Sequence, residues 1–225
     1  MTKTISIQPK AFFFDFDGVI VDSEKVHMLA ALEASRNHGI SFSEDYYFKE
    51  LLGYDDIGLF EHLWKEESRK LDGTTLKELM ARKNAAFMHF ISSQVIYFDG
   101  IVDFIRSLFN RGIPLCVVSG ALKKEILGCL AHGNLESYFK FIISADMVRA
   151  SKPDPESYER AWQDMLAFVP DLNKSDCWAI EDSPAGIYSA TEAGLNVIGI
   201  TNSVRADQLT RANHVISDVR EISIL

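Results

Sequence analysis

Residues 12–18 read FFFDFDG, a short apolar run that ends in two acids and a glycine. A continuous apolar run, rather than an alternating one, predicts a strand of a parallel sheet that is covered on both faces. Asp15 and Asp17 follow this strand, and Gly18 allows a tight turn. In open parallel sheets, ligands bind at the carboxyl ends of the strands. The stretch therefore predicts both the type of fold and the place of its site.

Short apolar runs recur further along the chain, at 114–118, 141–143, 177–180, 197–200 and, more weakly, 214–216. Apolar stripes of helical period lie between them, beginning for example at Ile101 and Tyr158. Strand and helix alternate in this way from about residue 96 onward. Such alternation predicts right-handed crossovers and an α/β fold with a doubly wound, mainly parallel sheet.

One long stretch, 23–95, interrupts this alternation. It contains helical stripes, such as the one on Ile57, Phe60 and Leu63, and no convincing strand. We therefore expect an all-helical domain at 23–95, inserted into a core domain that consists of 1–22 and 96–225.

The 225-residue chain is acidic, with a formal net charge of −9, so we expect no nucleic-acid or anionic membrane partner. No run of eighteen uncharged apolar residues predicts a spanning helix. The three cysteines are far apart and form no C-x-x-C pair, which favours buried thiols in a reducing compartment. Residues 1–10 carry no apolar stretch of signal-peptide length. We expect a cytoplasmic protein, and a monomer.

Three further motifs follow predicted strands or lie in the loops that leave the same edge. Ser119 and Gly120 come after the second run, and Lys152 lies in the proline-containing segment SKPDP. Glu181 and Asp182 end another run, directly before a Ser-Pro helix start. A glycine there lets backbone N–H groups approach a phosphate, and a lysine supplies a positive charge to its oxygens.

Each motif alone has a plainer explanation. Asp15 and Asp17 could form a polar turn, Ser119 a helix N-cap, and Lys152 a solvated side chain. The adjacent acids could simply favour a helix N-terminus. Together, however, these groups meet at one sheet edge, where two carboxylates about 4 Å apart repel by roughly 4 kcal/mol at an effective dielectric of about 20. A hard divalent cation offsets that repulsion, and oxygen ligands suit Mg²⁺.

The ordered motifs resemble those of the haloacid dehalogenase (HAD) superfamily of phosphohydrolases. They are DFDG at 15–18, SG at 119–120, KP at 152–153 and EDSPAG at 181–186. The chain is most similar to the branch with a helical cap after the first strand, which includes phosphoglycolate phosphatase-like and beta-phosphoglucomutase-like enzymes. This resemblance implies a Rossmann-like core with a helical cap domain. It also implies a Mg²⁺-dependent phosphatase that acts on a small phosphate ester of a sugar, polyol or glycolate through an aspartyl-phosphate.

The resemblance also implies roles for individual residues. Asp15 would be the nucleophile and a metal ligand, and Asp17 the general acid and base, with its carbonyl on the metal. Asp182 would bind the metal, with Glu181 as a direct or indirect ligand.

Three residues would bind the phosphate by the same resemblance. Ser119 and the N–H of Gly120 would hold the transferring group, and Lys152 would neutralise its charge.

Two alternatives stay open. Beta-phosphoglucomutases are similar through His27, but they carry a cap arginine three residues beyond a glycine, here Gly53, and that position is Asp56. An acid would repel a second phosphate, which disfavours a mutase. A phospho-aspartate signalling or binding module is the non-enzymatic alternative. It is disfavoured by the inserted cap and by Lys152, since a lid that excludes water serves turnover.

Overall fold

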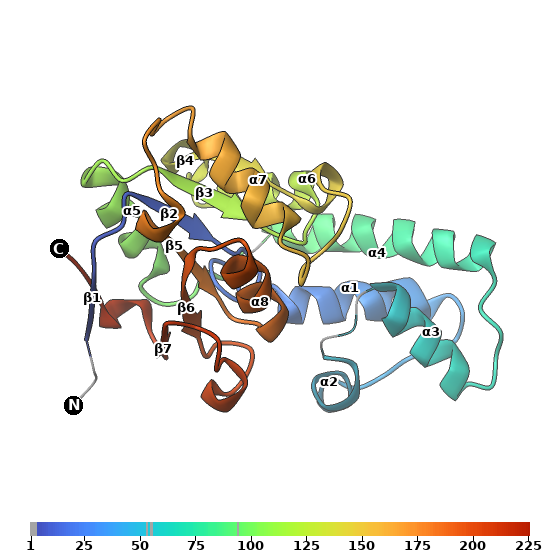
Figure 1. Cartoon of the computed structure of the whole chain (residues 1–225). Coiled ribbons are helices and arrows are strands. Elements are labelled where there is room, and N and C mark those ends of the chain that lie inside the picture. Colours follow the sequence, from blue (N-terminus) through green and yellow to red (C-terminus); the bar gives the residue numbers. More distant parts are fainter. Residues whose placement is uncertain (1–3, 53, 55, 94) are drawn as a thin grey trace. The chain divides into compact units, whose positions relative to one another are not determined.

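Six parallel strands, hydrogen-bonded in the order β4-β3-β2-β5-β6-β7, form the main sheet of this computed structural model (Figure 1). The structure describes residues 4–52, 54, 56–93 and 95–225. The strands are β2 (Ala11–Phe14), β3 (Leu115–Val118), β4 (Phe139–Ile143), β5 (Cys177–Glu181), β6 (Asn196–Ile200) and β7 (His214–Ile216). Because β3 and β5 flank β2 on opposite sides, the direction of winding changes at β2, where a doubly wound sheet binds its ligands.

Both faces of this sheet are covered, which explains the continuous apolarity of its strands. Phe13 belongs to the core cluster that includes α7 and α8 side chains, such as Tyr158. On the neighbouring positions of β2, Phe12 and Phe14 place their ring centroids 5.5 and 6.1 Å from that of Phe104 in α5. The connecting helices are α5 (Ile101–Asn110), α6 (Lys123–His132), α7 (Glu156–Met165) and α8 (Pro184–Glu192).

The prediction of a doubly wound, parallel α/β sheet is confirmed, and each predicted strand is present within two residues of its expected bounds. Two further strands were not predicted, β1 (Ile5–Ile7) and β8 (Ile222–Ile224), which pair in parallel as a separate small sheet. Each is only an Ile-Ser-Ile triplet, too short for a periodic pattern. Short 3₁₀ turns complete this part of the chain: η2 (Glu136–Tyr138), η3 (Ala145–Met147), η4 (Lys174–Asp176), η5 (Ala206–Gln208) and η6 (Val219–Glu221).

The chain divides into two compact units. The sheet unit consists of Met1–Asp22 and Val95–Leu225, and the helical unit of Ser23–Gln94. Every element described in the helical unit is a helix: α1 (Glu24–Arg36), α2 (Glu44–Tyr46), the π-helix η1 (Tyr47–Leu51), α3 (Asp56–Glu66) and α4 (Gly73–Ser93). It has its own buried core, to which Met28, Phe60 and Leu79 belong. Gly53, the reference position for the comparison with mutases, lies outside the described residues.

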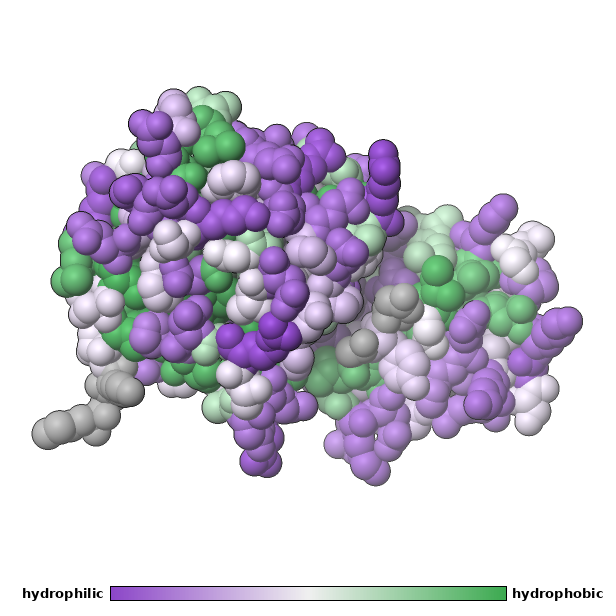
Figure 2. Space-filling view, viewed as in Figure 1, coloured by the Kyte–Doolittle hydropathy of each residue, from purple (hydrophilic) through white to green (hydrophobic). Residues whose placement is uncertain are grey.

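The surface in Figure 2 is mostly hydrophilic, and its apolar residues form small separate patches. Among the helices that the structure describes, none combines the length and the apolarity needed to span a membrane.

Candidate active site

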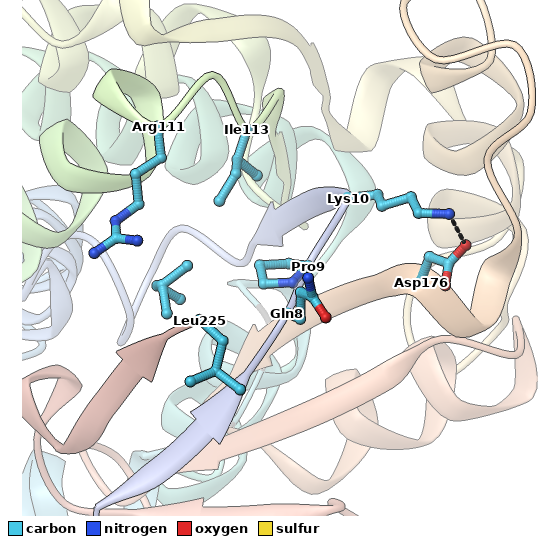
Figure 3. A pocket seen from close by; sticks show the side chains of 8 residues that line it. Gln8, Pro9, Lys10, Arg111, Ile113, Asp176 and Leu225 are labelled. Carbon is cyan, nitrogen blue, oxygen red and sulfur yellow. Dashed lines mark hydrogen bonds and ion pairs between the residues drawn. The ribbon is translucent and has the colours of Figure 1, made fainter.

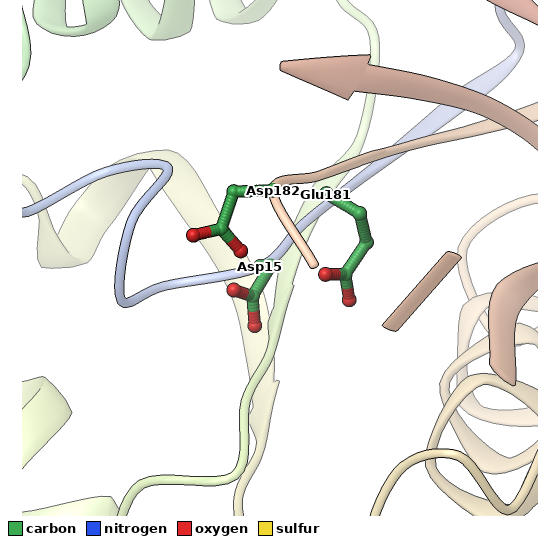
Figure 4. Close-up of side chains that lie close together, drawn as sticks. All are labelled: Asp15, Glu181 and Asp182. Carbon is green, nitrogen blue, oxygen red and sulfur yellow. The ribbon is translucent and has the colours of Figure 1, made fainter. Parts of the chain in front are cut away.

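Three carboxylates converge at the carboxyl edge of the main sheet (Figure 4). Asp15 follows β2, Glu181 ends β5, and Asp182 follows it. One oxygen of each lies within 4.8 Å of the others, and all three residues are buried. The register of the two strands pairs Phe14 with Ile180, and the Asp15 N–H donates to the Ile180 carbonyl at 3.1 Å. Strand pairing therefore places these carboxylates together.

Lys152 lies among these carboxylates and binds two of them. Its Nζ donates to Asp15 Oδ1 and to Glu181 Oε1, both at 2.6 Å, and to the Val118 carbonyl at 2.9 Å. An ammonium has three N–H groups, so these contacts use all of them. Lys152 therefore joins the ends of three strands, β2, β3 and β5.

The hydroxyl of Tyr158, in α7, donates to the same oxygen, Glu181 Oε1, at 2.6 Å. The ring also lies beside the lysine, with Lys152 Nζ 5.1 Å from the ring centroid. Sequence analysis identified Tyr158 only as a member of an apolar helix stripe. The available signal was chemical, since a fully buried tyrosine needs a partner for its hydroxyl.

Two glycines make room for the carboxylates. A Cβ on Gly186 would lie 1.9 Å from Glu181 Oε2, and one on Gly18 would lie 1.7 Å from Asp182 Oδ2. Gly18 also has a φ of +77°, a conformation that side chains with a Cβ rarely adopt. At both positions the backbone packs directly against a carboxylate. Any residue with a Cβ would collide with that carboxylate, so only glycine fits.

The cluster crowds three acids around one ammonium. Burial and the nearby Glu181 raise the pKa of Asp15 well above its usual range, and the same two causes raise the pKa of Asp182 to about 7. Burial lowers the pKa of the Lys152 ammonium, but Asp15 and Glu181 outweigh this, so its net direction is upward. The ammonium therefore remains charged, whereas Asp15 and Asp182 ionise fully only if a further cation offsets their repulsion.

A divalent cation fits this arrangement. Glu181 Oε2 is buried and has no hydrogen-bond partner among the described residues. Burying such an atom without a partner costs free energy of folding, and a ligand or an ion that pairs with it removes this cost. The donors that converge are all carboxylate oxygens, which suit a hard cation. The residues Asp15, Glu181 and Asp182 could therefore hold one.

The other predicted residues lie at the same edge. Ser119 is buried after β3, the neighbour of β2, and its Oγ accepts from the Ala121 N–H at 2.9 Å. Gly120 is exposed, and a Cβ there would meet nothing within 4 Å. Asp17 is half-buried and forms a single strand-like bridge with Val21. Asp15, Lys152 and Glu181 are thus in direct contact, with the Asp182 carboxylate within 4.8 Å of the other two carboxylates, and Ser119, Gly120 and Asp17 follow strands at the same edge.

Two residues in the loop after β6, which the sequence motifs do not include, also contact the site. Ser203 Oγ donates to Asp182 Oδ2, and Asn202 Nδ2 donates to the Gly18 carbonyl at 2.7 Å. The signal was weak but present, because Thr201-Asn202-Ser203 follows an apolar strand at the edge where the other motifs end.

A separate cavity of about 530 Å³ lies at the opposite edge of the sheet (Figure 3). Lys10 and Asp176, which line it and pair at 2.9 Å, directly precede β2 and β5. None of the predicted site residues lines this cavity. The candidate site at the carboxyl edge is therefore identified by its converging side chains and not by this cavity.

A family model and the known proteins that are similar to this chain indicate the same family. A family model described as haloacid dehalogenase-like hydrolase matches residues 12–200. The chain is 30% identical over 196 residues to a beta-phosphoglucomutase of Bacillus subtilis (85% of this chain, 83% of the relative). It is 25% identical over 224 residues to hexitol phosphatase A of Escherichia coli (96% and 94%). The crystal structure of CbbY from Rhodobacter sphaeroides in complex with xylulose-(1,5)bisphosphate has the same fold, with a TM-score of 0.82 at 21% identity (97% and 98%).

The contact between Tyr158 and Glu181 predicts that Tyr158→Phe weakens binding of a divalent cation by about 10–100-fold, because a residue that orients a ligand typically has this effect. Calorimetric titration of the metal-free protein measures it. Tyr97→Phe is the matched control, since that hydroxyl donates to the Cys129 carbonyl at 2.6 Å and touches none of the three carboxylates. Equal affinities in Tyr158→Phe and the native protein would refute the prediction.

Proposed function

Because the chain belongs to the haloacid dehalogenase-like hydrolase family, we propose that it is a Mg²⁺-dependent phosphatase that hydrolyses a small phosphorylated metabolite through a phosphorylated Asp15. The resemblance inferred from the ordered motifs is confirmed by the family match. The observation that carries the proposal is the buried Asp15 carboxylate, held by Lys152 beside Glu181 and Asp182 at the carboxyl edge of the sheet.

Asp15 is the proposed nucleophile. Lys152 binds Oδ1, so we assign the attack on phosphorus to Oδ2. The new bond joins Oδ2 to phosphorus, and the bond from phosphorus to the ester oxygen breaks. Asp17, two residues further along, protonates the departing alkoxide. It then takes a proton from the water that attacks the acyl phosphate, which releases phosphate and regenerates Asp15. One hard step is thereby divided into two easier ones.

Ser119, the N–H of Gly120 and Lys152 are the proposed phosphate ligands. The Ser119 Oγ accepts from Ala121, and its own proton is the one that we assign to a phosphate oxygen. All three N–H groups of Lys152 already have protein partners, so its main contribution is positive charge close to the nucleophile. Fixed charge of this kind stabilises a transition state without reorganisation.

Asp15, Asp182, Glu181 and the Asp17 carbonyl would hold Mg²⁺. When bound, the cation would lower the electrostatic barrier between an anionic carboxylate and an anionic ester. Glu181 Oε2, which has no hydrogen-bond partner among the described residues, and the convergence of three carboxylates around one ammonium support this assignment.

The mutase alternative is not favoured. Within the helical unit, Lys83 is buried, forms an ion pair with Asp56 Oδ1, and lies 3.3 Å from His27 Nδ1. A lysine that is already neutralised by an acid is a poor receptor for a second phosphate, which a sugar-phosphate mutase must hold. A polyol or sugar monophosphate is therefore the proposed substrate, and hexitol phosphatase A, to which the chain is similar, agrees with that class.

The proposal extends to the surroundings of the enzyme. Its partner is a small phosphate ester, and we place it in the cytoplasm as a monomer. The three cysteines, Cys116, Cys129 and Cys177, are buried and free, which supports a reducing compartment.

Asp15→Asn and Asp17→Asn should each lower hydrolysis of p-nitrophenyl phosphate by about 10³-fold or more, because each removes a group that acts in the transition state. Steady-state assays measure the loss, and circular dichroism and thermal unfolding check the fold. Near-native rates in either folded variant would contradict the assignment of that residue.

EDTA should abolish hydrolysis, and added Mg²⁺ should restore it, because the carboxylates repel one another without a cation. KCl at the same ionic strength as the added Mg²⁺ salt is the control for charge screening, and it should not restore hydrolysis. Full activity in EDTA would show that the carboxylates act without a metal.

A panel of phosphorylated sugars and polyols should be hydrolysed with kcat/KM about tenfold or more higher for monophosphates than for the matching bisphosphates, because Asp56 neutralises the Lys83 ammonium that would otherwise attract a second phosphate. Asp56→Asn should lower the ratio of kcat/KM for a monophosphate to kcat/KM for the matching bisphosphate. Asp45→Asn, which removes an exposed acid from the same unit, is the charge-matched control. A native preference for bisphosphates would contradict the proposal.

A further inference from the structure

We propose that Asn202 and Ser203 form a clip that positions the metal ligand Asp182 and the turn after Asp15 for catalysis. The inference rests on the proposed function and deepens it, because it assigns two positioning residues to the same site. Both residues lie in the loop after β6, a strand that contributes no carboxylate to the cluster.

The first half of the clip acts on Asp182. Ser203 Oγ donates to Asp182 Oδ2, and Asp182 is buried. A hydroxyl has one proton to donate, so it restrains one carboxylate oxygen and leaves the other to a cation. Gly18 packs against the same oxygen, since a Cβ there would lie 1.7 Å from Asp182 Oδ2 and 2.8 Å from Ser203 Oγ. The Asp182 carboxylate is thus confined between a hydroxyl and a backbone turn.

The second half of the clip acts on the turn that carries Asp17. Asn202 Nδ2 donates to the Gly18 carbonyl at 2.7 Å, and the Gly18 N–H donates to the Val21 carbonyl at 2.9 Å. Both peptide groups that flank Gly18 are therefore restrained. The first of them contains the Asp17 carbonyl, the proposed metal ligand, and Asn202 holds the second, so the two bonds together restrain the turn that carries Asp17.

The loop that carries the clip is itself held to the sheet. Strand register pairs Ile200 with Ile216, and the Thr201 N–H donates to the Ile216 carbonyl at 3.0 Å. Thr201 Oγ1 lies 3.4 Å from the same carbonyl. A site works when residues on rigid elements support its reacting groups, and here β6 and β7 provide that support. The clip thus ties the ends of β2 and β5 to a third strand.

Substitutions in the loop after β6 test the two halves of the clip separately. Ser203→Ala should weaken Mg²⁺ binding by about 10–100-fold in a calorimetric titration without substrate, and Ser203→Thr, which keeps the hydroxyl, should restore most of it. Asn202→Leu keeps the volume but removes the donor. It should lower kcat by about tenfold or more while KM changes less than threefold, because it acts on the turn that carries Asp17.

Thr201→Val is the matched control, since its hydroxyl lies in the same loop and faces Ile216 instead of the site. It should bind Mg²⁺ and turn over as the native protein does. Thermal unfolding in EDTA checks that each variant is folded. Native Mg²⁺ affinity in Ser203→Ala together with native kcat in Asn202→Leu would overturn the clip. An equal loss in Thr201→Val would also overturn it, because the effect would then belong to the loop as a whole.

A failure of the clip can be distinguished from a failure of the proposed function. If the native protein hydrolyses no phosphate ester, the proposed function fails. Ser203→Ala would still bind Mg²⁺ more weakly than Thr201→Val if the clip orients Asp182, because that titration needs no substrate.

Discussion

The contact of the Lys152 ammonium with the carboxylates of Asp15 and Glu181 is the interaction on which the site depends. Three acids that are buried within 4.8 Å of one another would repel strongly if nothing lay between them. Lys152 removes part of this repulsion, and because it also binds the Val118 carbonyl it ties the lysine loop to β3. Removing one partner of a buried ion pair leaves an uncompensated charge, so the groups are mutually dependent.

This constraint also explains residues that carry no charge. Tyr158 shares Glu181 Oε1 with the lysine, and Gly186 lets the start of α8 approach the other oxygen of the same carboxylate. Gly18 does the same for Asp182. Each makes close packing around a carboxylate possible, either by donating a hydrogen bond or by leaving out a side chain. The surroundings of the acids are therefore as specific as the acids themselves.

The main sheet and the meeting of the four motifs could be predicted because they depend on local patterns. Continuous apolar runs identified the strands, and a parallel sheet brings the carboxyl ends of neighbouring strands together. The sequence could not reveal β1 and β8, since an Ile-Ser-Ile triplet becomes a strand only through its partner. Tyr158 and Ser203 were missed for a related reason. Their contacts join residues 23 and 21 positions apart in the chain, and only the packed sheet defines which groups face each other.

The balance of charge differs between Lys152, which is half-buried, and Lys83, which is buried, and the difference bears on function. Lys152 faces two carboxylates with a third nearby, so one ammonium is shared among three acids and a further cation would stabilise their ionised forms. Lys83 in the helical unit has an acid of its own, Asp56, so it has little net charge to offer an anion. A protein that had to hold two phosphates would need a second centre of positive charge. Three acids that converge around Lys152, together with a Lys83 that is neutralised by Asp56, suit the hydrolysis of a single phosphate ester.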